Sequence, residues 1–303
     1  MTDDVRVLRL TAVSSDPEGG NPAGVVLDAS GLSNERMQGI AAEVGYAETA
    51  FVTEPPRAED PGRMRIRYFS PTAEVPFCGH ATVATAVALA DGLGSATVPT
   101  DGAFLFATPV GDVRITTRRE HEGTVASFTS VQPVVTDIPR DVRGRLLSLL
   151  GLTEGDLQPS HPPRLAFAGN THPVVVLADA GRYDGFTFDP SDARALMDEQ
   201  GWAGTITVAH AVGTAVERDA GPTEYETRNI FPVGTMNEDP ATGSAAAAFG
   251  AYLRALGLVR PPQRVLIHQG RHVGRPGLLT VDVPATGGIV VSGTATLIPD
   301  PHL

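Results

Sequence analysis

An alanine-rich stretch between Asn237 and Leu253, NEDPATGSAAAAFGAYL, constrains the fold of this chain most strongly. Pro240 ends the preceding segment, and Thr242 suits the N-cap of a helix that begins near Gly243. The alanines that follow have such small side chains that other backbone must enclose this helix closely. A helix start also exposes unpaired backbone N–H groups, which favour a bound anion. An ordinary capped core helix after an acidic turn explains these residues equally well, so the rest of the chain has to decide.

Length and charge exclude several classes of protein. At 303 residues the chain is at the upper limit of a single core, so we expect two domains. The net charge of −12 and the pI near 5.1 argue against a nucleic-acid partner, since phosphate binding needs clustered Lys and Arg. No segment approaches the ~20 apolar residues that span a bilayer. The first ten residues alternate like a strand and carry acids where a signal peptide needs bases, so we expect a cytoplasmic protein.

The two halves of the chain repeat one pattern. In the first half, the strand-like segment Arg65–Pro71 leads through an acidic loop to a small-residue helix, GHATVATAVALA, at Gly79–Ala90. In the second half, Tyr225–Pro232 leads through an acidic loop to TGSAAAAFGAYL at Thr242–Leu253. A period of half the chain indicates two similar domains. We therefore predict an α/β (α+β) fold of two pseudo-symmetric domains, each with strands wrapped around one central helix.

The domain boundary is expected at the start of the segment Gln132–Pro163, a helix followed by a Pro-rich loop. This division gives domains 1–132 and 133–303. Two equivalent helix N-termini, at Gly79 and Gly243, can then face each other across a cleft, and clefts between domains are preferred ligand sites. An anionic small molecule such as a carboxylate is the natural ligand of two helix N-termini.

Five side chains near these elements could carry chemistry. Cys78 and His80 lie at the first helix start, and Asp239 and Ser244 at the second. Glu48 shares a strand face with interior positions, and an inward acid has a raised pKa, which suits a general acid or base. Structural alternatives stay open: a solvated strand-end acid for Glu48, a core histidine for His80 and an inert buried thiol for Cys78.

The sequence offers little for metal or nucleophilic chemistry. Cys78 is the single cysteine, which excludes an intramolecular disulfide and an all-cysteine metal site, and the histidines show no close metal-ligand spacing. We expect no structural metal. A triad of Ser244, His80 and Asp239 is arithmetically possible, but no GxSxG elbow supports a hydrolase. The Gly-rich turn Gln269–Pro276, QGRHVGRP, is more often a structural hairpin than an anion clamp.

Five motifs, taken in order, resemble a known family. They are GNPAGVVLDA (20–29), AETAFV (47–52), FSPTAEVPFCGHATVAT (69–85), EDPATGSAAA (238–247) and QGRHVGRP (269–276). Together they resemble the phenazine-biosynthesis PhzF-like family over nearly the whole chain. The resemblance implies a diaminopimelate epimerase-like fold, in which each domain is a curled mixed sheet around a central helix. It also implies an enzyme that uses no cofactor and forms a homodimer.

The resemblance also implies roles for individual residues. A well-understood member isomerises trans-2,3-dihydro-3-hydroxyanthranilate. By motif, Glu48 would move a proton between two ring carbons, while His80, Asp239 and Ser244 would hold the polar groups of the substrate. The catalytic set is therefore expected to be Glu48, His80 and Asp239, and the substrate-binding set Gly79, Gly243 and Ser244.

Two departures from the family pattern concern the substrate. The serine that usually precedes the catalytic glutamate is Ala47 here, and the serine that ends the GRPS turn is Gly277. The related fold also hosts epimerases with two cysteines, one at each helix start, but this chain has Cys78 at the first and Asp239–Ala241, with no cysteine, at the second. Our leading hypothesis is a cofactor-independent isomerase that moves a proton between carbons of a small carboxylate. An epimerase or racemase of a small amino acid, or a non-catalytic metabolite-binding protein, is the alternative.

Overall fold

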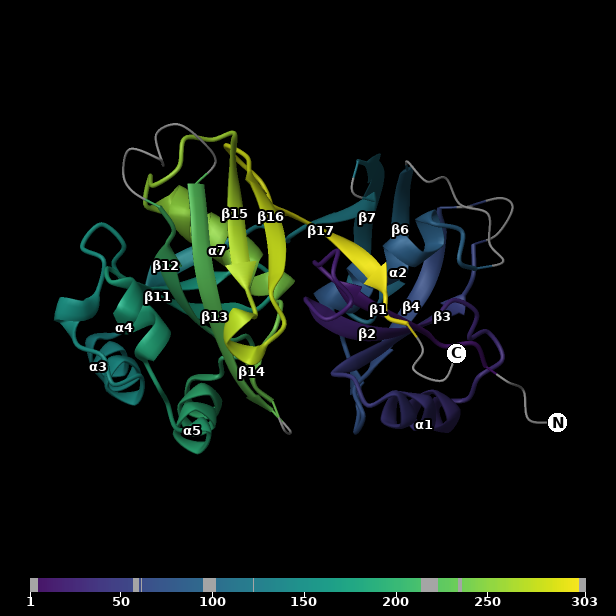
Figure 1. The fold of residues 1–303 in the computed structure, drawn as a ribbon, viewed down its shortest axis with the longest axis horizontal. Helices are drawn as coiled ribbons and strands as arrows, with labels where there is room; N and C mark the ends of the chain where they lie inside the picture. The colour runs from purple at the N-terminus through teal and green to yellow at the C-terminus, as the bar shows by residue number, and fades with distance from the viewer. Residues whose placement is uncertain are drawn as a thin grey trace. The chain divides into compact units, whose positions relative to one another are not determined.

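Strands wrapped around two central helices form the framework of the structure, a computed structural model (Figure 1). It describes residues 5–56, 60, 62–94, 102–121, 123–213, 223–233 and 236–299. The chain divides into two units, one made of Met1–Thr129 with Ser292–Leu303 and the other of Ser130–Val291. This division differs from the expected domains 1–132 and 133–303, because the last strand returns to the first unit and pairs with its first strand.

The strands of the first unit form a ring. They are β1 (Leu8–Ala12), β2 (Asn21–Val26), β3 (Glu48–Glu54), β4 (Arg63–Phe69), β5 (Glu74–Val75), β6 (Gly102–Thr108), β7 (Gly111–Glu120), β8 (Gly123–Thr129) and β17 (Val290–Leu297). Pairing runs through β1, β2, β3, β4, β6, β7 and β8 in that order, and β17 pairs with both β8 and β1. The sheet therefore curls until its two edges share one strand.

The helix α2 (Gly79–Ala90) occupies the interior of this ring. Its residues from His80 to Ala90 are all buried, and it packs against β1, β2, β3, β7 and β8. Alanine, valine and threonine allow strands to approach the helix from several sides. The hydroxyls of Thr82 and Thr85 donate to carbonyls one turn earlier, each at 2.7 Å, so these buried polar groups are satisfied.

A second layer covers the outer face of the first unit. The helix α1 (Asn34–Val44) begins after Ser33, whose hydroxyl accepts a hydrogen bond from the backbone N–H of Arg36 at 3.2 Å. Its buried face, with Met37 and Ile40, packs on β3 and β4. Both faces of β3 are therefore covered, which explains why Thr49–Val52 are all buried instead of alternating.

The second unit is built from the same kinds of element. Its strands are β9 (Val134–Asp137), β10 (Arg164–Phe167), β11 (Thr171–Leu177), β12 (Ile206–Ala211), β13 (Thr223–Val233), β14 (Met236–Asp239), β15 (Gln263–Gln269) and β16 (Gly277–Val283). Its helices are α3 (Arg140–Leu149), α4 (Ala180–Gly185), α5 (Pro190–Gln200) and α7 (Gly243–Ala255), with short 3₁₀ turns at Glu154–Asp156 and Arg271–Val273.

The two units share one topology. In the first, the successive pairs β1–β2, β2–β3, β3–β4, β4–β6 and β6–β7 are antiparallel, parallel, antiparallel, parallel and antiparallel. The pairs β10–β11, β11–β12, β12–β13, β13–β15 and β15–β16 repeat that series in the second. The helix α7 packs against β9, β10, β11 and β16, as α2 packs within its own ring. The predicted internal repeat and the central position of both small-residue helices are confirmed.

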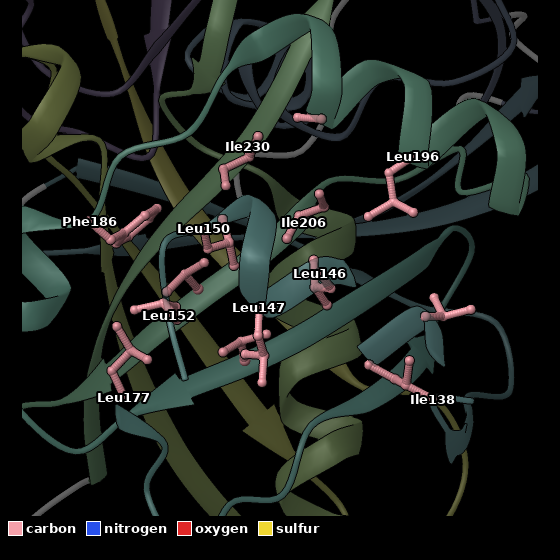
Figure 2. Close-up of a cluster of buried hydrophobic side chains, with 14 of the residues drawn as sticks. Ile138, Leu146, Leu147, Leu150, Leu152, Leu177, Phe186, Leu196, Ile206 and Ile230 are labelled. Carbon is pink, nitrogen blue, oxygen red and sulfur yellow. The ribbon is translucent and has the colours of Figure 1, made fainter. Parts of the chain in front are cut away.

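The outer face of the second unit carries a larger apolar layer. Figure 2 shows its cluster of buried side chains, which includes Leu146 and Leu147 from α3, Leu196 from α5 and Ile206 and Ile230 from the sheet. The sheet is therefore covered by α7 on one face and by shorter helices on the other. Among the described residues, no helix is long and apolar enough to cross a membrane.

Candidate functional site

The start of α2 brings three predicted side chains together. Glu48 is the first residue of β3, Cys78 is the N-cap of α2, and His80 lies in its first turn. The Cys78 thiol donates to Glu48 Oε2 at 3.4 Å and lies 3.3 Å from His80 Nδ1 and 3.7 Å from Nε2. His80 Nε2 lies 3.4 Å from Glu48 Oε2. The expectation that Glu48 points inward agrees with this cluster, although 20% of its side chain stays exposed to solvent.

His80 is a neutral partner in this cluster. Burial lowers the pKa of His80 to about 4, and a hydrogen bond with the backbone of Pro22 only partly opposes this shift. The amide nitrogen of Asn21 lies 3.2 Å from His80 Nδ1 and holds the ring from the neighbouring strand. At neutral pH the imidazole therefore brings polar contacts, and no positive charge, to the Glu48 carboxyl group.

Three donor atoms here are also close enough to hold a cation. Glu48, Cys78 and His80 each offer one ligand atom, and the three atoms all lie within 4.8 Å of one another. From the spacing of cysteine and histidine we expected no structural metal. Spacing alone does not show this grouping, because Glu48 is thirty positions from Cys78 and the strand order of the ring brings it to the helix start.

The start of α7 has the same place in the second unit as the start of α2 has in the first, but it carries different side chains. Thr242 is the N-cap that corresponds to Cys78, and Ser244 corresponds to His80. The hydroxyl of Thr242 was expected to cap the helix but donates instead to Asp239 Oδ2, at 2.6 Å. The hydroxyl thus gives its proton to a carboxylate in a charge-assisted hydrogen bond, while its oxygen accepts from Gln269 Nε2 at 3.0 Å and from no backbone N–H of the helix.

Ser244 has a histidine partner that sequence reasoning did not single out. His172, on β11, is fully buried, and its Nε2 lies 3.2 Å from Ser244 Oγ. The backbone N–H of Thr205 donates to His172 Nδ1 at 3.0 Å. The Thr205 carbonyl also lies 3.1 Å from this nitrogen, but the amide proton is fixed by the backbone and points at Nδ1, which makes Nδ1 an acceptor.

The tautomer of His172 determines whether the Ser244 hydroxyl can lose its proton to the ring or donate it to a substrate. Because Nδ1 accepts, the neutral ring carries its proton on Nε2 and donates it to Ser244 Oγ. Burial lowers the pKa of His172 to about 4, so the ring stays neutral at pH 7. The proton of the Ser244 hydroxyl is then directed away from His172, which suits binding of a substrate oxygen. The same tautomer cannot take that proton, which argues against a nucleophilic serine.

Gln269, another residue that sequence reasoning missed, organises the start of α7. Its Oε1 accepts from the Thr242 N–H at 3.2 Å, and its Nε2 donates to the Asp239 carbonyl at 2.7 Å and to Thr242 Oγ1 at 3.0 Å. The next residue, Gly270, has a φ of +89°, and a Cβ there would lie 2.6 Å from the Pro240 carbonyl oxygen. The QGRHVGRP turn therefore packs directly against the EDPATGS turn.

The two acids at 238–239 have different partners. Glu238 is buried against Arg228 of β13, with 2.5 Å from its Oε1 to an Arg228 guanidinium nitrogen. That guanidinium also donates to the carbonyls of Tyr183 and Phe186 and lies 3.8 Å above the Phe186 ring. Glu238 thus anchors β14 to β13, and Asp239 is the acid that remains at the helix start.

The rest of the Gly-rich turn is structural. Arg271 donates to both Glu226 and Asp184, and His272 contacts Asp184 at 3.1 Å. Half of the Arg271 side chain is exposed. These contacts agree with the expectation of a structural hairpin, and they place the charges of Arg271 in local ion pairs.

Comparison with known proteins places these motifs in one family. The family of phenazine biosynthesis-like proteins, PhzC-PhzF, matches residues 10–300. The chain belongs to this family. The uncharacterized isomerase YddE of Escherichia coli O157:H7 is 32% identical over 97% of this chain and 96% of its own length. The trans-2,3-dihydro-3-hydroxyanthranilate isomerase of Pseudomonas chlororaphis is 32% identical over 89% of this chain and 87% of its own.

Solved structures confirm the fold class. The phenazine biosynthesis protein of the PhzF family from Bacillus anthracis has a TM-score of 0.80 at 26% identity, with 97% of this chain and 96% of that chain covered. A proline racemase and a hydroxyproline epimerase share the fold at TM-scores of 0.56 and 0.57, at 15% and 13% identity. The chain is therefore a PhzF-family isomerase with a diaminopimelate epimerase-like fold.

Proposed function

We propose that this PhzF-family isomerase moves a proton between two carbons of a small carboxylate, with Glu48 as the general acid and base. The observation that carries the proposal is the placement of Glu48 beside a helix start, next to Cys78 and a neutral His80, with 20% of its side chain still open to solvent. A carboxyl group held in this way can reach a substrate carbon and return the same proton to another. His80 orients this acid, which is its role in the proposed catalytic set.

The proposed substrate is a cyclic carboxylate that resembles trans-2,3-dihydro-3-hydroxyanthranilate. The supporting observation is the relative from Pseudomonas chlororaphis, whose name carries that substrate and which aligns with most of this chain. Ala47 and Gly277 replace two serines of the motif pattern, so this chain lacks two hydroxyl groups of that pattern. We therefore propose a cyclic carboxylate as the class of substrate, and we expect its substituents to differ from those of trans-2,3-dihydro-3-hydroxyanthranilate.

Groups of the second unit are proposed to bind the polar atoms of the substrate. Ser244 offers a hydroxyl proton, since its oxygen already accepts from His172. Asp239, the third member of the proposed catalytic set, is held by Thr242 and is suited to accept from an amino or hydroxyl group. Gly79 and Gly243 open the two central helices, where backbone N–H groups favour a carboxylate. The expected homodimer stays a prediction, which light scattering in solution can test.

A screen in deuterated water tests the function. Cyclic amino and hydroxy carboxylates, including dihydro-hydroxyanthranilate, are incubated with the protein and followed by proton NMR. Wild-type protein is expected to incorporate deuterium and to shift a double bond in at least one compound. The variant Glu48→Gln should bind that compound without exchange, while Glu43→Gln, at an exposed acid on α1, should match the wild type. Equal exchange by Glu48→Gln and the wild type would refute the role of Glu48.

A further inference from the structure

We propose that Thr242, directed by Gln269, is a positioning residue that holds the carboxylate of Asp239 in place to accept a hydrogen bond from the substrate. This role rests on the proposed function, in which Asp239 binds an amino or hydroxyl group. Thr242 contacts the acid through its side chain, so it is expected to act on the substrate through Asp239.

Backbone groups fix the orientation of the Gln269 side-chain amide. Its Oε1 accepts from the Thr242 N–H at 3.2 Å, and its Nε2 donates to the Asp239 carbonyl at 2.7 Å. A backbone N–H can only donate and a carbonyl oxygen can only accept, so these two bonds exclude a flipped amide. The same nitrogen lies 3.0 Å from Thr242 Oγ1 and therefore donates to it as well.

This donor determines where the hydroxyl proton of Thr242 goes. Thr242 Oγ1 accepts from Gln269, and its own proton lies in the hydrogen bond to Asp239 Oδ2, at 2.6 Å. The distance is typical of a charge-assisted hydrogen bond from a hydroxyl to a carboxylate, which is stronger than a neutral one. The donors thus run in one direction, from Gln269 through Thr242 to the carboxylate, and Asp239 Oδ2 is an acceptor.

The plane of the Asp239 carboxylate depends on this hydrogen bond. The backbone of Asp239 is fixed, because it pairs with Asn229 in the sheet and its carbonyl accepts from Gln269. The last torsion of an aspartate side chain has broad minima, so a fixed backbone alone does not set the plane of the carboxylate. The hydrogen bond from Thr242 sets it at one oxygen. Asp239 is partly exposed, so its carboxylate can also accept from a ligand.

The start of α2 in the first unit shows the same use of an N-cap residue. Cys78 and Thr242 are the N-cap residues of α2 and α7, and neither side chain makes a capping hydrogen bond in these two described helices. A threonine at this position usually caps its helix. Cys78 Sγ instead donates to Glu48 Oε2, at 3.4 Å, as Thr242 donates to Asp239. Both N-cap side chains thus contact an acid of the proposed catalytic set, which favours a role in the site.

The relative affinity for two carboxylates tests the positioning role. Anthranilate (2-aminobenzoate) has an amino group beside its carboxylate, and benzoate is the same compound without that group. In isothermal titration calorimetry with the intact chain, the wild type should bind anthranilate about tenfold more tightly than benzoate, as expected for one hydrogen bond to a charged group. Thr242→Val keeps the branched shape and removes the hydroxyl. It should reduce this preference to less than about threefold and leave the affinity for benzoate unchanged.

Thr124→Val is the matched control. The Thr124 hydroxyl also donates to an aspartate at 2.6 Å, but that residue is Asp91, at the other end of α2, and both threonines are buried. This variant should keep the wild-type preference. Thr242→Ser retains a hydroxyl and should restore the preference, with circular dichroism confirming the fold of each variant. A change that only loosened the start of α7 would weaken both ligands alike, so the ratio of the two affinities separates positioning from stability.

The outcomes distinguish this role from the proposed function. An anthranilate preference in Thr242→Val equal to that of the wild type overturns the positioning role, and so does a wild type that has no preference or binds neither compound. A wild type with the expected preference, lost in Thr242→Val, but with no deuterium exchange into dihydro-hydroxyanthranilate, would refute that substrate and leave the positioning role intact. Exchange by the wild type with an unchanged preference in Thr242→Val would refute the positioning role alone.

Discussion

Replacement of Gln269 by methionine should strongly destabilise the second unit, although it changes a single residue. Gln269 is only 2% exposed and is the last residue of β15, so its side chain reaches the start of α7 from a rigid strand. Methionine has a similar length and fills the same space, but it can neither accept from the Thr242 N–H nor donate to the Asp239 carbonyl. The change thus removes polar contacts with little change in volume.

The magnitude follows from the hydrogen bonds that are lost. The three contacts of Gln269 measure 2.7, 3.0 and 3.2 Å, and each is worth about 1 kcal/mol of net stability. The total loss is therefore about 3 kcal/mol, because the Thr242 amide and the Asp239 carbonyl are left without this partner. Gln38→Met is the matched control in α1, where the side chain makes one hydrogen bond, to the Ser70 carbonyl at 2.8 Å, and about 1 kcal/mol is expected.

Urea unfolding and amide exchange measure the two effects. Far-ultraviolet circular dichroism gives the free energy of unfolding, and hydrogen exchange should show faster exchange at Thr242 and in the first turn of α7 in Gln269→Met only. A loss under 1 kcal/mol for Gln269→Met, or equal losses for both variants, would contradict the assigned role of Gln269.

Three further predictions concern neighbouring residues. Gly270→Ala places a Cβ 2.2 Å from the Arg275 carbonyl oxygen and should cost about 3 kcal/mol, whereas Gly274→Ala, with φ of +73° and no atom within 4 Å, should cost about 1 kcal/mol in the same urea assay. Burial lowers the pKa of His172 from its ordinary 6.5 to about 4, so the unfolded chain gains a proton first on acidification. The contribution of neutral His172 to the free energy of unfolding is therefore complete above pH 6.5, and about 3 kcal/mol of it is lost by pH 4. The difference in free energy of unfolding between the wild type and His172→Gln should shrink by the same amount. Ser244→Ala should raise KM about tenfold with a smaller change in kcat, while Ser148→Ala, at an exposed site, should change neither.

The repeat and its central helices were predictable because packing constrains them strongly. A run such as Ala245–Ala248 is stable in a protein core only where backbone surrounds it closely, and the same argument applies to Gly79–Ala90. The strand-like segments that precede each of these helices in the sequence then allowed the order of the elements to be predicted. The return of β17 to the first unit was not predictable, since strand pairing between distant segments leaves no local pattern.

The candidate site was predictable in part. Motif order pointed to Glu48 and His80, and the ring topology brings them together with Cys78. His172 and Gln269 were missed because their importance depends on a tautomer and on a side chain that spans two loops. The only signals in the sequence were the Asn-Thr-His-Pro opening of one repeat, at 170–173, and the first position of the QGRHVGRP motif.

Deuterium incorporation by Glu48→Gln measures directly whether Glu48 transfers the proton. With a substrate from the screen, mass spectrometry would follow the rate at which solvent deuterium enters the product carbon. If Glu48 is the general acid and base, Glu48→Gln should slow this rate by about 10²- to 10⁴-fold, the usual contribution of such a group, with ligand affinity close to that of the wild type. An exchange rate within a few-fold of the wild type, in a variant that still binds the substrate, would contradict it.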